Sequence, residues 1–179
     1  MIEVEIKCRI NNPEEIAEKL IQRVNAKMVR TVFQKDFYLQ HPSRNFEETD
    51  EAIRIRDSDE GVQLTYKGPK IDALSKTREE LCVHVDNFET TLKIFERVGF
   101  LPIAKVVKSR IIFQLEGNII ASIDKVQNLG DFIELESEVE DYNQVEIKRE
   151  NLFSILDKLG LSRENTERRS YLELIMPRS

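Results

Sequence analysis

The chain opens with a strict alternation of apolar and charged side chains. Apolar residues occupy positions 2, 4 and 6, and the charged residues Glu3, Glu5 and Lys7 lie between and after them. Successive side chains of a strand point to opposite faces, so this pattern predicts a β-strand over residues 2–10. A helix is predicted next at about 13–24, with Asn12 as its N-cap and Pro13 in its first turn.

The same reading of the remaining chain predicts further strands and two further helices. Strands are predicted at 28–39, 52–56, 62–67, 77–85, 103–115, 118–125 and 131–139, and helices at 88–98 and 143–159. Gly99 and Gly160 stand where these two helices end, a position that favours glycine because the backbone turns left-handed there. A helix precedes three strands in each half of the chain, which suggests an internal repeat as a hypothesis.

Composition places the chain in a broad class. Its 179 residues, 40% hydrophobic and 34% charged, fit a single domain over residues 1–179. No apolar run approaches the ~20 residues that span a bilayer, and the start lacks the features of a signal peptide, so we expect a cytoplasmic protein that binds no membrane. The net charge of -6 argues against nucleic acid as a partner, because phosphate backbones need a basic surface.

Few side chains are available for histidine or thiolate chemistry. His41 and His84 are the two histidines of the sequence, so a metal would have to be held by carboxylates. Cys8 and Cys82 are far apart in the sequence and are expected to be reduced packing residues.

Charged residues fill the polar face of nearly every predicted strand. They are Glu3, Glu5, Lys7, Arg54, Arg56, Lys67, Arg78, Glu80, Lys108, Arg110, Asp124, Glu134 and Glu136. Each strand taken alone is typical of a sheet with one face in water. Taken together, the strands present apolar faces that the three amphipathic helices must cover, so the charged faces of the strands point away from the helices. They then either form a broad charged sheet facing solvent or line the inside of a closed barrel.

A barrel with these residues inside could not be dry, because an isolated buried charge costs on the order of several kcal/mol. A polyphosphate would pair with the arginines and lysines, and divalent metal ions would pair with the carboxylates. The chemistry that this interior favours is phosphoryl or nucleotidyl transfer.

The motifs resemble the CYTH superfamily, the triphosphate tunnel metalloenzymes. The strand Glu3-Val4-Glu5-Ile6-Lys7 matches the Glu-x-Glu-x-Lys signature, and the segments at 52–56, 65–69, 77–80, 108–110 and 130–136 follow in family order. The segment at 34–56 and the later Arg169-Ser170-Tyr171 look most like the class IV adenylyl cyclase branch. Cys82 departs from the pattern, because many members have an acidic residue there. The resemblance implies an α+β fold, a closed eight-stranded antiparallel β-barrel with helices packed on the outside.

The resemblance also implies roles for the inward residues. Triphosphate would be bound by Lys7, Arg54, Arg56, Lys67, Arg78, Lys108 and Arg110, among which Lys7, Arg56, Lys67, Lys108 and Arg110 would serve catalysis. Mg²⁺ or Mn²⁺ would be held by Glu3, Glu5, Asp124, Glu134 and Glu136. Mutual repulsion among the glutamates of the first and last strands is expected to disfavour their ionisation.

The implied activity is that of an adenylyl cyclase, which converts ATP to cyclic AMP and pyrophosphate. Two alternatives stay open at this point: a phosphatase of inorganic or thiamine triphosphate, and a non-catalytic module that binds nucleotide or polyphosphate. The partner in each case is a small-molecule triphosphate, and a homodimer is possible.

Overall fold

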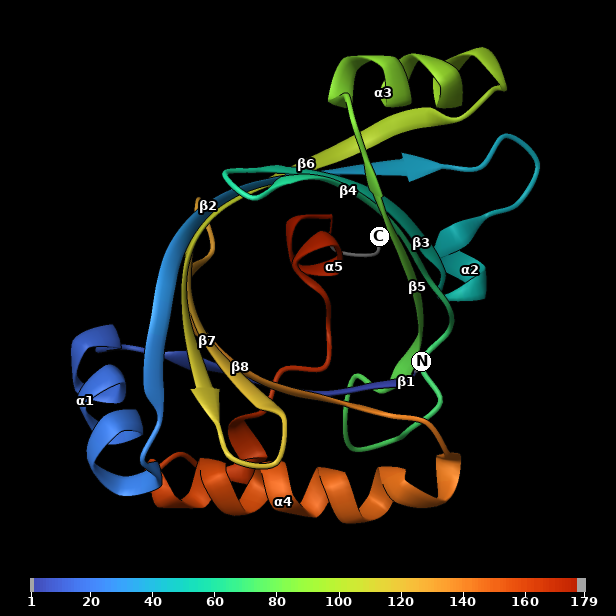
Figure 1. Cartoon of the computed structure of the whole chain (residues 1–179). Coiled ribbons are helices and arrows are strands. Elements are labelled where there is room, and N and C mark those ends of the chain that lie inside the picture. Colours follow the sequence, from blue (N-terminus) through green and yellow to red (C-terminus); the bar gives the residue numbers. More distant parts are fainter. Residues whose placement is uncertain (1, 177–179) are drawn as a thin grey trace.

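Eight antiparallel strands close into a barrel in the computed structural model, which describes residues 2–176 (Figure 1). The strands are β1 (Ile2–Ile10), β2 (Lys27–Gln40), β3 (Ala52–Ser58), β4 (Gly61–Lys67), β5 (Arg78–Val85), β6 (Leu101–Leu115), β7 (Ile119–Val126) and β8 (Gly130–Val139). Their order around the barrel is β1-β5-β4-β3-β2-β6-β7-β8. The closed eight-stranded barrel predicted from the sequence is therefore confirmed.

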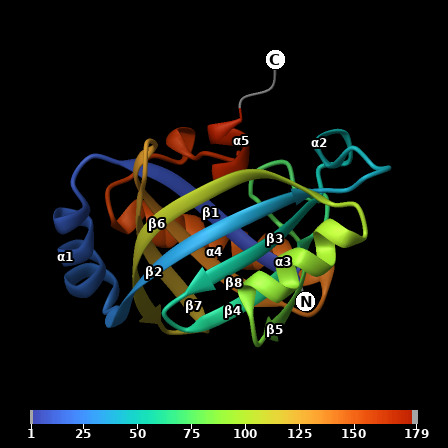
Figure 2. The same cartoon turned by 90° about the horizontal axis from the view of Figure 1, so that it is seen from above.

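The helices lie outside the barrel and at one of its ends. They are α1 (Pro13–Val24), α2 (Phe46–Thr49), α3 (Phe88–Arg97), α4 (Val145–Lys158) and α5 (Tyr171–Ile175). Figure 1 shows α1 and α4 along one side of the barrel and α3 on the opposite side, and Figure 2 shows α2 and α5 at the same end. The two short helices were not predicted, because so few residues carry no readable helical period. Within residues 2–176, no helix is both long and apolar enough to cross a membrane.

The two halves of the chain have the same order of elements. Apart from the short helix α2 between β2 and β3, the first half runs β1, α1, β2, β3, β4, and the second runs β5, α3, β6, β7, β8. Equivalent strands pair across the halves: β1 pairs with β5, and β2 pairs with β6. The first strand of each half also pairs with the last strand of the other half, β5 with β4 and β1 with β8. This two-fold pattern is the topology that the internal repeat predicts.

The outward faces of β1 and its neighbours form the main apolar core, beneath α1 and α4. Val4 and Ile6 are buried there with Cys8, where burial raises the pKa of the thiol to about 11. The packing role predicted for Cys8 is thus confirmed, but that for Cys82 is wrong, since Cys82 is exposed on β5. The physical reason is that β1 pairs only with the start of β5, at Arg78 and Glu79, so the later part of β5 has β4 as its one neighbour in this sheet.

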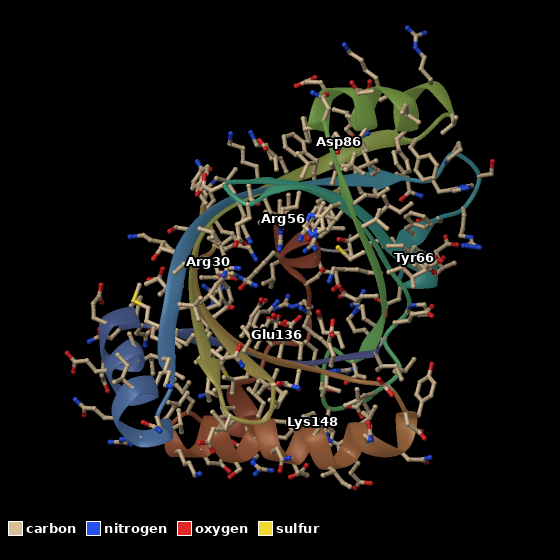
Figure 3. All side chains as sticks on the ribbon, viewed as in Figure 1. Arg30, Arg56, Tyr66, Asp86, Glu136 and Lys148 are labelled. Atoms are coloured by element: carbon tan, nitrogen blue, oxygen red, sulfur yellow. The ribbon has the colours of Figure 1, made fainter. Side chains whose placement is uncertain are left out.

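The inward faces are charged along most of the barrel. In Figure 3, Arg56 and Glu136 lie within the ring of strands, whereas Lys148 lies on α4, outside the ring. A second, smaller apolar cluster lies against α5; it consists of Tyr38, Ala52, Val106, Val126, Phe132 and Tyr171. The interior therefore changes from charged to apolar towards the end where α5 lies.

Candidate functional site

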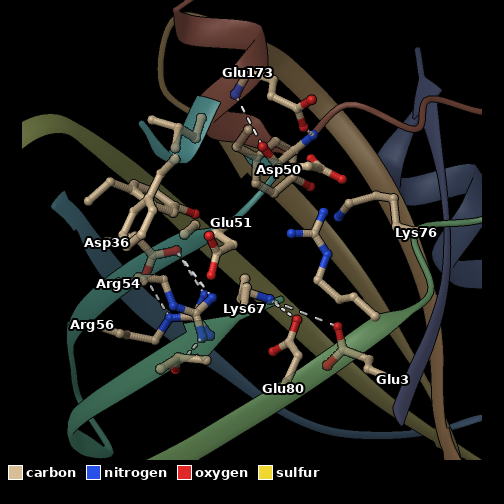
Figure 4. Close-up of a pocket in the computed structure, with 18 of the residues that line it drawn as sticks. Glu3, Asp36, Asp50, Glu51, Arg54, Arg56, Lys67, Lys76, Glu80 and Glu173 are labelled. Carbon is tan, nitrogen blue, oxygen red and sulfur yellow. Dashed lines mark hydrogen bonds and ion pairs between the residues drawn. The ribbon is translucent and has the colours of Figure 1, made fainter. Parts of the chain in front are cut away.

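The inward strand faces enclose a cavity of about 700 Å³, a volume typical of small-molecule sites. Figure 4 shows part of its lining. The charged lining residues are Glu3, Glu5, Asp36, Glu47, Asp50, Glu51, Arg54, Arg56, Lys67, Lys76, Arg78, Glu80, Lys108, Arg110, Glu134, Glu136, Glu138 and Glu173. Ten of the twelve residues predicted for the site are in that set. The other two, Lys7 and Asp124, are buried behind the lining.

Asp36 on β2 organises the two arginines of β3. Arg56 donates to both of its carboxylate oxygens, from Nε at 2.6 Å and from Nη2 at 2.8 Å, and Arg54 Nη1 lies 3.9 Å away. Burial opposes ionisation of Asp36, but Arg56 and Arg54 outweigh it and lower the pKa of the carboxyl. Arg54 Nη2 donates to Thr65, while its buried Nε has no partner within residues 2–176. That Nε is thus a buried donor without a hydrogen-bond partner among the described residues.

Asp124 on β7 has a similar role beside β6. Arg110 donates to it from Nε at 2.7 Å and Nη2 at 2.6 Å, Lys108 Nζ lies at 3.1 Å, and the Tyr171 hydroxyl donates at 2.9 Å. Burial opposes its ionisation, but Arg110 and Lys108 lower the pKa of the carboxyl. The metal role predicted for Asp124 fits poorly, because its two oxygens already accept four hydrogen bonds. The geometry favours Asp124 as the residue that orients Arg110 and Lys108.

Lys7 is held away from the cavity. Its Nζ donates to the Arg169 carbonyl oxygen at 2.5 Å and lies 4.3 Å from the centre of the Tyr171 ring, with Glu134 at 4.0 Å. Burial, aided by Lys76, lowers the pKa of Lys7 to about 7. The structure thus places this lysine under the C-terminal segment.

The carboxylates of β1 and β8 face one another. Glu5 is opposite Glu136, and Glu3 is opposite Glu138. Burial raises the pKa of Glu3 and of Glu136, and neighbouring carboxylates add to the rise in both. The expected repulsion is confirmed for these two residues. It is wrong for Glu134, where burial also opposes ionisation but Arg110, Lys76 and Lys108 lower the pKa.

The donor set is suited in part to a divalent metal ion. Mg²⁺ and Mn²⁺ prefer oxygen ligands, and the raised pKa values of Glu3 and Glu136 mark a place where negative charge lacks compensation. Glu5 adjoins them, although its carboxylate accepts from Lys76 Nζ at 2.5 Å. In the part of the chain that the structure describes, no three acidic, histidine or cysteine side chains already converge as a metal site. Glu3, Glu5 and Glu136 are therefore suited to hold a divalent metal ion. Glu134 and Asp124 are less suited, because Arg110 already contacts both.

Four functional residues were missed in the sequence. Asp36 and Tyr171 lie in quoted motifs without an assigned role, and Glu80, which contacts Lys67, was noted as charged but not placed in the site. Lys76 belongs to the β4–β5 loop, where no strand period indicates direction. The loop folds back so that Lys76 also donates its backbone N–H to the Glu5 carbonyl at 3.0 Å.

The loop is fixed from both sides. Arg149 on α4 donates to Asp72 at 2.8 Å, and Lys70 Nζ donates to Asp50 at 2.5 Å and to Glu173 at 3.3 Å. These contacts join α4, α2 and α5 to the same loop. Its buried Lys76 is thereby held in the cavity.

Comparison with known proteins gives one consistent family. The model described as CYTH domain matches residues 1–171. The chain is 44% identical to "Putative adenylate cyclase MJ0240" of Methanocaldococcus jannaschii, over 97% of this chain and 98% of that protein. The structure of PH1819 from Pyrococcus horikoshii superposes with a TM-score of 0.89 at 40% identity, covering 97% of this chain and 98% of the other. HpAC1 from Hippeastrum, described with a dominant triphosphatase activity, shares the fold with a TM-score of 0.66 at 17% identity, covering 97% and 95%.

Proposed function

The chain belongs to the CYTH domain family, and from that premise we propose that it is a metal-dependent adenylyl cyclase that converts ATP to cyclic AMP and pyrophosphate. Family members are enzymes that act on triphosphates with divalent metal ions. The observation that carries the proposal is one cavity lined by guanidinium, ammonium and carboxylate groups together, in which burial and neighbouring carboxylates raise the pKa of Glu3 and of Glu136.

We assign triphosphate binding to the basic groups that line the cavity. Arg54 lines the cavity, and Arg56 and Lys108 are held in place by Asp36 and Asp124. Charge-assisted hydrogen bonds of this kind are suited to phosphate oxygens. Arg78, Arg110, Lys67 and Lys76 extend the same positive lining. Lys7 acts through its contacts with Glu134 and the C-terminal segment, as a positioning residue.

Glu3, Glu5 and Glu136 are the residues that we assign to metal. A bound Mg²⁺ or Mn²⁺ would neutralise phosphate charge and lower the pKa of the attacking hydroxyl. The protein's own part is to present the three carboxylates beside the phosphates. The proposal covers either of these two metal ions.

The reaction forms one bond and breaks one. The ribose 3′ oxygen bonds to the α-phosphorus, its proton is released, and the bond to the bridging oxygen of the β-phosphate breaks as pyrophosphate leaves with the electron pair. Arg54, Arg56 and Lys108 stabilise the charge that builds on the departing pyrophosphate. The cyclase name of the 44% identical relative supports this reaction over hydrolysis.

A triphosphatase is the second candidate, because the same cavity could hold a triphosphate for attack by water. The activity described for HpAC1, a protein of the same fold, favours keeping it. A module that binds polyphosphate without turnover is the third. A cytoplasmic location and a homodimer stay predictions.

One experiment separates the three candidate functions. Purified protein is incubated with Mg²⁺ or Mn²⁺ and with ATP, tripolyphosphate or thiamine triphosphate, and the products are identified. Cyclic AMP from ATP supports the cyclase. Orthophosphate released together with ADP, pyrophosphate or thiamine diphosphate, and without cyclic AMP, moves the protein to the triphosphatases. Binding without turnover of any substrate would identify the protein as a non-catalytic module that binds polyphosphate.

A further inference from the structure

Of the three carboxylates assigned to metal, Glu5 alone has a close basic partner within residues 2–176. Lys76 Nζ donates to Glu5 Oε1 at 2.5 Å. Glu3 lies 4.0 Å from Lys67, and Glu136 has no basic side chain within that distance among the described residues. Glu5 is 4% exposed and Lys76 is 8% exposed. Lys76 therefore compensates a buried negative charge that would be costly without a partner.

The backbone that carries Lys76 is held in place, whereas its ammonium group is at the end of a flexible stem. The backbone N–H of Lys76 donates to the Glu5 carbonyl oxygen at 3.0 Å. The hydroxyl of the preceding Ser75 donates to Asp72 at 2.5 Å and lies 2.6 Å from the Thr77 hydroxyl. Figure 4 shows the side chain of Lys76 extending into the pocket. Rotation about the bonds of its four-carbon stem can thus move the charge within the cavity while the loop stays where it is.

Lys76 and a divalent metal ion would compete for the Glu5 carboxylate. Both are cations, so their charges repel each other when both lie against the same carboxylate. A triphosphate offers Lys76 another partner, because Lys76 lines the same cavity as Arg54 and Lys108, which we assign to phosphate. A lysine ammonium group pairs with phosphate oxygens as well as with carboxylates. The ion pair with Glu5 can therefore be replaced by an ion pair with phosphate.

We propose that Lys76 exchanges partners, pairing with Glu5 until metal binds and with a phosphate oxygen afterwards, and so couples the binding of metal to that of triphosphate. Before metal binds, Glu5 retains the Lys76 ammonium, which then contributes little to the binding of phosphate. Once Glu5 holds metal, the same ammonium is released to the triphosphate. Each ligand therefore strengthens the binding of the other, as linkage requires. This exchange rests on the proposed function, because it needs metal and triphosphate in one cavity.

Calorimetric titrations test the exchange, with Mn²⁺ alone and with tripolyphosphate in the presence and absence of Mn²⁺. Wild type is compared with Lys76→Met, which removes the ammonium group and keeps a long side chain. Lys108→Met is the matched control: it removes the same charge from the same cavity, but Lys108 contacts Asp124, which we do not assign to metal. Lys76→Gln keeps a hydrogen-bond donor for Glu5, and it replaces Lys76→Met if melting curves show that Lys76→Met is unfolded.

We expect Lys76→Met to bind Mn²⁺ about tenfold more tightly than wild type, the scale of one charge-assisted hydrogen bond, because Glu5 has lost its competing partner. Lys108→Met should bind Mn²⁺ within about twofold of wild type, because its charge acts only from a distance. With Mn²⁺ present, Lys76→Met should bind tripolyphosphate about tenfold more weakly than wild type, and without Mn²⁺ the difference should be smaller.

Unchanged or weaker binding of Mn²⁺ by Lys76→Met would overturn the exchange. An equal gain in Lys108→Met would overturn it as well, because any loss of positive charge in the cavity would then have the same effect. Unchanged binding of tripolyphosphate by Lys76→Met with Mn²⁺ present would show that the released ammonium does not pair with phosphate, which also overturns it. In these cases wild type still binds both ligands, and the proposed function stands. A wild-type protein that binds neither ligand would overturn the proposed function, and the exchange with it.

Discussion

Glu134 and Glu136 lie two residues apart on the inward face of β8, yet their surroundings shift their pKa values in opposite directions. Burial disfavours the charge of both. Glu134 is compensated by Arg110, which also contacts it directly, whereas Glu136 is repelled by Glu134 and Glu5. The two carboxylates therefore affect stability with opposite signs.

For Glu136 the folded pKa lies above the unfolded value, so its ionised form destabilises the fold once the pH exceeds the unfolded pKa. Glu136→Gln should match or exceed the wild-type free energy of unfolding in metal-free buffer at pH 7. Glu134→Gln should lose about 3 kcal/mol, because it removes one partner of a buried ion pair. Urea denaturation measures both, with the exposed Glu116→Gln as control. A large loss for Glu136→Gln would mean that Glu136 is a structural ion-pair partner.

Arg54→Ala should weaken tripolyphosphate binding by roughly 1.5–3 kcal/mol, the value of a hydrogen bond to a charged group. Arg54 lines the cavity, and Asp36 would keep Arg56 as its bidentate partner, so the fold should survive. Calorimetric titration gives the affinity. Lys105→Ala is the control on β6, since Lys105 is exposed. Equal affinity in Arg54→Ala and wild type would remove Arg54 from the phosphate site.

Lys108 provides a test by pH. Burial, with help from Arg110, lowers the pKa of its ammonium group to about 8, so part of the ligand-free protein has a neutral Lys108 at pH 8. A bound triphosphate favours the charged form, so binding should take up protons, and affinity should fall as the pH rises through about 8. Titrations at pH 8 in buffers of different ionisation enthalpy count these protons. Lys108→Met should reduce the uptake; an unchanged count would place the proton elsewhere.

How far the sequence predicts this site depends on strand periodicity. The alternation at Glu3, Glu5 and Lys7 identified the inward face of β1 correctly, because α1 and α4 bury the apolar outward face of this strand. Lys7 is inward, yet a period of two residues cannot show that the C-terminal segment covers it. Lys76 lies in a loop without any period, and its direction is set by contacts with Glu5, far away in the sequence.

The same limit applies at the end where α5 lies. Tyr171 begins a helix of five residues, too short for an apolar stripe, and its place in the barrel depends on contacts with Asp124 and Phe132. The chemistry of a lone cysteine predicts a packing residue at Cys82, and it carries no information on where the strand lies in the sheet. The exposure of Cys82 follows from the way β5 leaves β1, a property of sheet closure.

Tyr171→Phe isolates the contribution of the hydroxyl to Asp124. The ring stays against Phe132 and Lys7, but one hydrogen bond to a buried carboxylate is lost. We expect a loss of about 1.5 kcal/mol in unfolding free energy, the lower range for a hydrogen bond to a charged group. Tyr142→Phe, at a position that is 64% exposed, should change stability by much less. Equal effects of the two substitutions would mean that the Tyr171 hydroxyl does not stabilise Asp124.

The central claim is that this barrel turns ATP into cyclic AMP, and phosphorus NMR of one reaction tests it most directly. ATP is incubated with the protein and Mn²⁺ or Mg²⁺, and the products are followed until the substrate is consumed. We expect equal amounts of cyclic AMP and pyrophosphate, with neither formed by Glu136→Gln. Orthophosphate with ADP in place of cyclic AMP, or no change in ATP at all, would contradict it.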